Sequence, residues 1–145
     1  MNSNLLSTVF IIDDSEIDTF ILKRFIKQNL EMAGLTDSIS EFDFAQEALS
    51  QINTSLKENE EYNFPKLIFL DINMPDMNGF EFMDEFIKYP STYTSNCKII
   101  LISSSDNLED IEKSKTYPNI INFVKKPITD EEVLVQLKKA HVLTN

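Results

Sequence analysis

The chain has 145 residues with an apolar share of 42%, which suits one domain with a single core and excludes a disordered protein. Its formal net charge of -11 would be repelled by a phosphate backbone, so we expect no nucleic-acid partner. We also expect a cytoplasmic protein without a membrane segment. No apolar run approaches the ~20 residues of a membrane helix, the N-terminus lacks signal-peptide features, and the single cysteine, Cys97, has no partner thiol.

Apolar runs typical of strands alternate five times with patterns typical of helices. The runs at 9–12, 67–70 and 99–102 lack polar alternation, as expected for strands covered by helices on both faces. This alternation predicts an α/β fold with a parallel sheet and right-handed crossovers. We predict strands near residues 7–12, 39–44, 67–71, 98–103 and 120–124, and helices near residues 15–32, 46–59, 79–89, 106–115 and 130–142.

Short motifs predict where several of these helices begin and end. Thr129 and Glu132 have the spacing of a capping box at the start of the last helix. Ser15 and Asp18 resemble one at the start of the first helix, with the shorter Asp in place of Glu. Gly34 is expected to end that first helix.

The chain has only two glycines, Gly34 and Gly79, and the second is expected to mark the turn into the third helix. With so little glycine no phosphate-binding glycine loop is available, which excludes a P-loop or a dinucleotide fingerprint. The one histidine, His141, is expected to be a helix-end residue and not a phosphorelay histidine. Cys97 is expected to be a small apolar filler near a strand start.

Four predicted strands end in side chains that can bind a metal ion or a phosphoryl group. Asp13 and Asp14 follow the first strand, Asp71 ends the third, Ser103 ends the fourth, and Lys126 follows the fifth. The carboxyl ends of parallel strands meet at one edge of the sheet, where ligands bind in open α/β folds. We therefore expect these side chains to converge.

This set of groups suits magnesium-assisted phosphoryl transfer. Asp13, Asp14 and Asp71 would repel one another, and Mg²⁺, which prefers oxygen ligands, would relieve the repulsion. Taken alone, Asp13 and Asp14 are better explained as a solvated turn with a helix cap; the third carboxylate favours the metal site. Asp71 could then attack phosphorus, while Lys126 and Ser103 bind phosphoryl oxygens.

Four segments together resemble the receiver domains of two-component response regulators. They are residues 11–15, 69–79, 101–105 and 123–127; the second is the most specific, because Met74-Pro75 and Asn78-Gly79 follow Asp71. The resemblance covers roughly residues 7–142 and leaves no output domain, so we expect one stand-alone receiver domain over 1–145. It implies a flavodoxin-like (βα)5 fold with strand order 2-1-3-4-5.

The resemblance also implies roles for the acidic residues. Asp71 would be the phosphoacceptor, phosphorylated by a histidine kinase or a histidine phosphotransfer protein. Mg²⁺ would be the cofactor, held by Asp13, Asp14, Asp71 and the backbone carbonyl of Asn73. We expect no enzymatic turnover beyond the domain's own phosphorylation and dephosphorylation.

Further roles follow from the resemblance for residues of the last two strands. Ser103 matches the switch hydroxyl, and Phe123 occupies the aromatic switch position. Lys126 matches the phosphate-pairing lysine because Pro127 follows it, and the peptide between these two is expected to be cis. Lys125 would point to the other face of the strand.

The expected output surface is the face formed by the fourth helix, the fifth strand and the fifth helix. Residues 106–145 carry six Lys and seven acidic residues, so this part of an acidic chain is nearly neutral. We expect a downstream protein partner or a second copy of the chain to bind there.

Two alternatives remain open from the sequence. A phosphatase of the haloacid dehalogenase type also forms an aspartyl phosphate. By resemblance, that family would carry an Asp-x-Asp motif in its first strand. In this chain Asp71 lies in the third predicted strand, and Asn73 stands two residues after it. A degenerate receiver would act only as a binding module, but it would lack the acid pair, the acceptor or the lysine. All of them are present.

Overall fold

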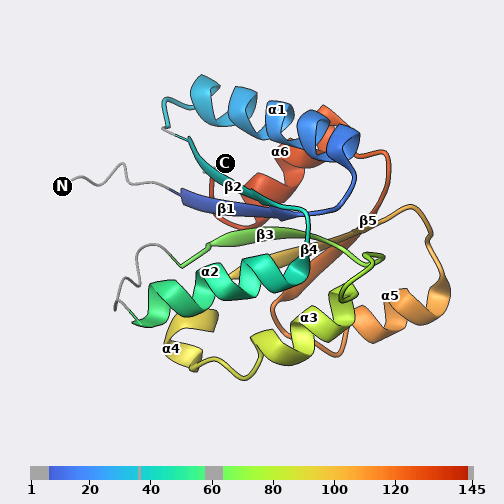
Figure 1. The fold of residues 1–145 in the computed structure, drawn as a ribbon. Coiled ribbons are helices and arrows are strands. Elements are labelled where there is room, and N and C mark those ends of the chain that lie inside the picture. Colours follow the sequence, from blue (N-terminus) through green and yellow to red (C-terminus); the bar gives the residue numbers. More distant parts are fainter. Residues whose placement is uncertain (1–6, 36, 58–63, 144–145) are drawn as a thin grey trace.

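One parallel sheet of five strands forms the centre of the structure (Figure 1). The structure is a computed structural model and describes residues 7–35, 37–57 and 64–143. The strand order β2-β1-β3-β4-β5 confirms the predicted α/β, flavodoxin-like topology. The strands are β1 (Ser7–Ile12), β2 (Asp37–Phe42), β3 (Leu67–Asp71), β4 (Lys98–Ser103) and β5 (Ile120–Lys125).

Helices cover both faces of this sheet. Figure 1 shows α1 and α6 on one face, with α2, α3 and α5 on the other. Among the helices of the described residues, none is long and apolar enough to cross a bilayer. The helices are α1 (Glu16–Met32), α2 (Ala45–Lys57), α3 (Gly79–Phe86), α4 (Ser91–Thr94), α5 (Leu108–Ser114) and α6 (Asp130–Lys139).

Alternate side chains of each central strand enter two separate cores. In β1, Phe10 and Ile12 pack on the side of α2 and α3, whereas Val9 and Ile11 pack on the side of α1 and α6. All four are at most 2% exposed. Burial on both faces explains why these strands have no polar alternation. Cys97 is fully buried in the first of these cores, as expected for a small apolar filler.

The predicted helix signals are confirmed at two ends and in part at a third. Thr129 and Glu132 form the capping box of α6. Gly34 follows the end of α1 with a φ of 75°, the left-handed conformation that glycine adopts most easily. Ser15 caps α1 by accepting a hydrogen bond from the backbone N–H of Asp18 at 3.3 Å. The Ser15 N–H, however, donates to Asp13 Oδ1 and not to Asp18, so this end differs from a capping box.

Other predicted boundaries are wrong by a few residues. The second strand ends at Phe42 and not at 44, because its pairing with β1 ends where β1 does, at Ile12. The third helix ends at Phe86, and α4 was not predicted; it is one turn long and begins after Pro90. The predicted end of the second helix at 59 lies outside the described residues.

The last helix also ends earlier than predicted, at Lys139 and not at 142. His141 has a φ of 61°, and the N–H of Val142 donates to the carbonyl of Leu137 at 2.9 Å, which closes the helix end. His141 therefore lies just beyond the helix, as expected for a helix-end residue.

Candidate functional site

The carboxyl ends of the central strands bring the predicted polar side chains together. Asp71 is the last residue of β3, and Asp13 follows β1; they are 4% and 1% exposed. Ser103 ends β4 and is fully buried, and Lys126 follows β5 with its side chain 15% exposed. A cluster of charged groups this well buried must be held by mutual pairing or by a bound ion.

Three carboxylates form the acidic side of the site. One oxygen from each of Asp13, Asp14 and Asp71 lies within 4.8 Å of the others. The N–H of Ser15 donates to Asp13 Oδ1 at 3.0 Å, and the N–H of Asn73 donates to Asp71 Oδ1 at 3.3 Å. These bonds fix the two buried carboxylates, while Asp14 is exposed at the mouth of the site.

The donor set fits a hard divalent cation such as Mg²⁺. Its atoms are all carboxylate oxygens. A cation beside Asp13, Asp14 and Asp71 would offset the repulsion among the three. The exposed mouth at Asp14 leaves room for the waters that Mg²⁺ keeps. The carbonyl of Asn73 remains a predicted ligand.

Lys126 is the basic side of the site. Its Nζ lies 2.9 Å from Asp13 Oδ2, 3.0 Å from Asp18 Oδ2 and 3.4 Å from Asp71 Oδ2. The peptide between Lys126 and Pro127 is cis, as the resemblance implies. Lys125 points elsewhere: it is exposed, and its ammonium lies 3.9 Å from Asp106. Lys126 therefore lies at the site and Lys125 does not; the pairing of Lys126 with a phosphoryl group stays a prediction.

The two sides of the site shift each other's protonation. Burial, and then the negative charge of Asp13, raises the pKa of Asp71 to about 7, although Lys126 and the Asn73 N–H act in the opposite direction. Burial alone would lower the pKa of Lys126, but its contacts with Asp13 and Asp18 outweigh burial and raise it. The site therefore holds the ammonium of Lys126 beside the carboxylate of Asp71, and a cation would favour the ionised form of that carboxylate.

The predicted switch residues lie on the last two strands, Ser103 at the end of β4 and Phe123 on β5. The Ser103 hydroxyl accepts a hydrogen bond from the N–H of Ser105 at 3.1 Å. The carbonyl of Ser103 accepts one from the N–H of Lys126 at 2.7 Å, which ties the ends of β4 and β5 together. Phe123 is half-buried and packs against the core on the side of α2 and α3. Movement of either side chain stays a prediction.

The prediction from sequence missed Asp18. It is the third residue of α1, and its Oδ2 lies 3.0 Å from the ammonium of Lys126. The available signal was the imperfect capping-box spacing after Ser15, which placed an acid one turn into a helix that starts at the site. That spacing did not reveal the direction of the Asp18 side chain.

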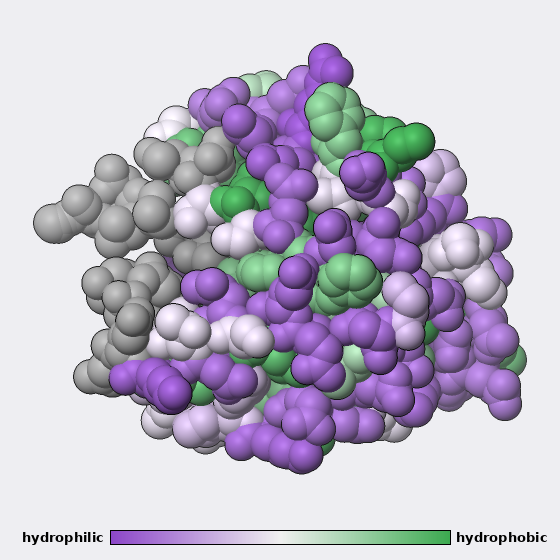
Figure 2. Space-filling model, viewed as in Figure 1, coloured by the Kyte–Doolittle hydropathy of each residue, from purple (hydrophilic) through white to green (hydrophobic). Residues whose placement is uncertain are grey.

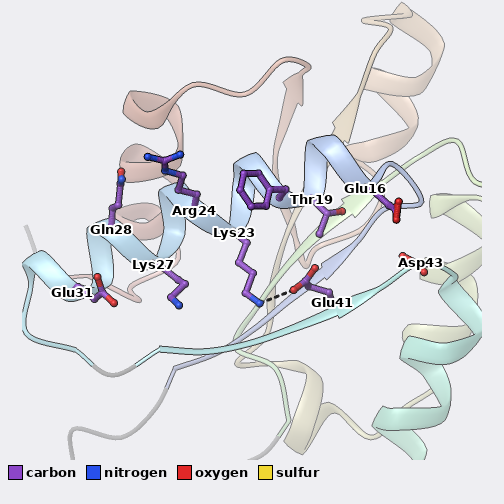
Figure 3. A pocket seen from close by; sticks show the side chains of 10 residues that line it. Glu16, Thr19, Lys23, Arg24, Lys27, Gln28, Glu31, Glu41 and Asp43 are labelled. Atoms are coloured by element: carbon purple, nitrogen blue, oxygen red, sulfur yellow. Dashed lines mark hydrogen bonds and ion pairs between the residues drawn. The ribbon is translucent and has the colours of Figure 1, made fainter.

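A larger groove lies elsewhere in the structure. It has a volume of about 740 Å³ and lies between α1 and the edge strand β2 (Figure 3). Lys23 crosses it to pair with Glu41 at 2.7 Å. The groove is lined mainly by exposed charges of both signs and has no buried reactive group, whereas the acidic site combines burial, strand ends and a lysine. We therefore assign the chemistry to the acidic site despite its smaller volume.

Comparison with known families and proteins agrees with this geometry. A family model described as the response regulator receiver domain matches residues 9–138. Hybrid signal transduction histidine kinase L of Dictyostelium discoideum is 30% identical over 139 residues, 94% of this chain, and histidine kinase CKI1 of Arabidopsis thaliana is 30% identical over 103 residues, 68% of this chain. The chain spans only 7% and 9% of the length of these two relatives.

Solved structures show the same architecture. A two-component response regulator from Cytophaga hutchinsonii has a TM-score of 0.78 with 25% identity, over 94% of this chain and 97% of that one. A response regulator receiver protein from Dyadobacter fermentans has a TM-score of 0.73 with 28% identity, over 94% and 98% of the two chains.

Proposed function

This chain belongs to the family of response regulator receiver domains, and on that basis we propose that Asp71 accepts a phosphoryl group from a histidine kinase or a histidine phosphotransfer protein. The observation that carries the proposal is the setting of Asp71: a buried carboxylate at a strand end, with oxygens of Asp13 and Asp14 within 4.8 Å and the ammonium of Lys126 at 3.4 Å. The similarity of this chain to two histidine kinases and to two solved response regulators supports this role.

The transfer forms one bond and breaks another. A carboxylate oxygen of Asp71 attacks the phosphorus of a phosphohistidine, the P–N bond breaks, and the imidazole leaves with the electron pair and takes up a proton from solvent. The product is an acyl phosphate on Asp71. Such a transfer depends on positioning and charge neutralisation. Lys126, 3.4 Å from Asp71 Oδ2, is placed to bind a phosphoryl oxygen, and Ser103 is placed behind it.

We propose that the reaction depends on Mg²⁺. When bound, the ion supplies positive charge between the carboxylates and the phosphoryl oxygens. Asp13, Asp14 and Asp71 would hold it, together with the carbonyl of Asn73. The Asp71 carboxylate must be ionised to attack, and Lys126 together with the Asn73 N–H favours that form.

An apolar patch beside the site suits a docking phosphodonor. Ile17, Phe20 and Ile21 on the first turns of α1 are 72%, 65% and 39% exposed. Figure 2 shows green apolar surface at the upper right, over the N-terminal half of this helix, among mostly hydrophilic surroundings. Exposed side chains of this size in one place are typical of protein interfaces. We propose that the phosphohistidine-bearing protein binds this patch.

We further propose that phosphorylation changes protein contacts at the α5-β5-α6 face. This is the predicted output face; the additional helix α4 shifts the helix numbers by one. Leu108 on α5 and Val135 on α6 are 71% and 43% exposed, so each helix presents an apolar side chain. A downstream partner or a second copy of the chain would bind there. Phe123 on β5 lies behind it and would transmit the change.

A phosphatase of the haloacid dehalogenase type is disfavoured by Asn73. Asn73 stands two residues after Asp71, at the place where that family has a second Asp that acts as general acid. An amide cannot donate a proton in that role. We propose that the protein catalyses only its own phosphorylation and dephosphorylation.

The test is labelling with a small phosphodonor. Incubation with acetyl phosphate and Mg²⁺, followed by measurement of intact mass, should add one labile phosphoryl group to the wild-type protein. Asp71→Asn should add none, and Asp110→Asn, which removes the same charge from exposed α5, should label normally. Equal labelling of Asp71→Asn would overturn the assignment.

A further inference from the structure

Asp18 makes a contact that the proposed phosphoryl transfer does not use. Its Oδ2 lies 3.0 Å from Lys126 Nζ, the distance of a charge-assisted hydrogen bond. Asp18 is not part of the carboxylate cluster of Asp13, Asp14 and Asp71. Its side chain is 38% exposed, and that of Lys126 is 15% exposed.

The contact draws Lys126 away from the acceptor. The ammonium is closer to Asp13 and Asp18, at 2.9 Å and 3.0 Å, than to Asp71, at 3.4 Å. An ammonium has three donors, and three carboxylates now surround it. A phosphoryl group on Asp71 would add new acceptor oxygens, and Lys126 would have to weaken one of its present contacts to reach them. The contact with Asp18 is the one that Lys126 can lose, because Asp18 is neither the reacting carboxylate nor a member of the carboxylate cluster.

We propose that Asp18 is a positioning residue that restrains Lys126 in the unphosphorylated protein and thereby opposes its pairing with a phosphoryl group. The inference rests on the proposed phosphorylation of Asp71. A ligand-bound state is favoured only by contacts that differ between the two states. The Asp18 contact is strongest before phosphorylation, so it stabilises the unphosphorylated state and lowers the affinity of the site for a phosphoryl group.

The experiment measures the affinity for beryllofluoride, a phosphoryl mimic, at saturating Mg²⁺ by titration of amide NMR signals. Asp18→Asn keeps the shape of the side chain and removes its charge. We expect it to bind the mimic roughly two- to fivefold more tightly than wild type, the range that partly exposed ion pairs allow. Glu16→Gln is the matched control, because it removes one acidic charge from the same first turn of α1 without a contact to Lys126.

Two further variants separate positioning from a general charge effect. Asp18→Glu restores a carboxylate at this site and should return the affinity toward the wild-type value. In a Lys126→Met background, Asp18→Asn should have no greater effect than Glu16→Gln, because the contact no longer exists. Thermal melts of all variants check that the fold is intact.

The outcomes distinguish this inference from the proposed function. If wild type fails to bind the mimic, the assignment of Asp71 fails and the restraint by Asp18 fails with it. If wild type binds but Asp18→Asn binds equally or more weakly, only the role of Asp18 is wrong. An equal gain in Glu16→Gln would attribute the effect to net charge and overturn the contact as its cause.

Discussion

Gly79 lies directly against the strand end that carries Asp71. A Cβ at Gly79 would lie 3.0 Å from the carbonyl oxygen of Asp71 and 3.1 Å from the Cα of Ile72. The N–H of Gly79 also donates to the carbonyl of Ile72 at 2.8 Å, which closes the loop after β3. The first residue of α3 therefore packs on the backbone of Asp71 and Ile72.

Replacement of Gly79 should disturb the acceptor loop. The neighbouring atoms are backbone and cannot rotate away, so we expect Gly79→Ala to cost about 1–3 kcal/mol of unfolding free energy. Urea denaturation measures the loss. Labelling by acetyl phosphate should also slow, because the loop holds Asp71.

Gly34→Ala is the contrasting variant. Its φ of 75° is unfavourable for alanine, but, apart from its two chain neighbours, no atom of the described residues lies within 4 Å of the added Cβ. We expect it to cost roughly 1–2 kcal/mol through backbone strain and to leave labelling at the wild-type rate. Slowed labelling in both variants would show that general destabilisation is the cause.

Mg²⁺ should stabilise the protein through the three carboxylates. A ligand that binds only the folded state at 100 times its Kd adds about 2.7 kcal/mol of stability, so the thermal midpoint of wild type should rise with added Mg²⁺. Asp14→Ala should lose most of that rise, because it removes one of the three carboxylates. Asp110→Ala, an acid on α5 away from the site, should keep it. An identical response in wild type and Asp14→Ala would place the ion elsewhere.

Beryllofluoride should change the environment of residues well beyond the site. We expect amide shifts from Ser103 through residues 106–128, because Ser103 would move toward the phosphoryl mimic and Phe123 would fill the vacated space. The expected coupling free energy between the Asp71 site and the α5-β5-α6 face is ~1–3 kcal/mol. Ser103→Ala should confine the shifts to the neighbours of Asp71. Shifts that stay confined in wild type would refute this switch.

The apolar patch on α1 should matter for a protein donor only. Ile17→Ser and Phe20→Ser should slow transfer from a phosphorylated histidine phosphotransfer protein by roughly an order of magnitude, as exposed interface anchors do. Labelling by acetyl phosphate should not change, because that molecule needs no docking surface. Ile87→Ser, at the end of α3 and 51% exposed, is the control and should transfer normally. Slowed transfer in Ile87→Ser would show that the docking surface does not lie at the patch on α1 alone.

The contact between Tyr117 and Asp84 should give a stability that depends on pH. The Tyr117 hydroxyl donates to Asp84 Oδ1 at 2.7 Å, and burial together with this bond raises the pKa of Tyr117 from 10.0 to about 12. The folded state thus favours neutral Tyr117, so its stabilisation is complete below pH 10 and is lost as pH rises toward 12.

Removal of the Tyr117 hydroxyl tests whether its stabilisation of the fold falls as the pH rises. Tyr117→Phe should lose about 0.5–1.5 kcal/mol of unfolding free energy at neutral pH. The deficit relative to wild type should shrink at about pH 11. Tyr93→Phe, which removes a hydroxyl without a hydrogen bond shown in the structure, should match wild type at both values. A deficit that does not change with pH would contradict the shift in pKa.

The positions of Asp71 and Lys126 could be predicted because each follows an apolar run, and parallel strands carry their carboxyl ends to one edge. The end of β2 could not be predicted from the sequence, because an edge strand takes its register from its single partner, here β1. The one-turn helix α4 has too few residues for a periodic pattern. The Asp18 contact depends on where a helix side chain points after packing, and spacing along the chain does not determine that.

The strand ends at the site continue the ladder of the sheet beyond the strands themselves. The amides of Asp13, Ile72 and Lys126 donate to Phe42, Ile102 and Ser103 on neighbouring strands at 3.1, 3.1 and 2.7 Å. These amides should therefore exchange with deuterium as slowly as those of the strand interiors, and they should do so with or without a phosphoryl group. The main chain around Asp71 would then be a fixed frame, and we expect a signal to leave it by side-chain rotation without any local opening of the backbone.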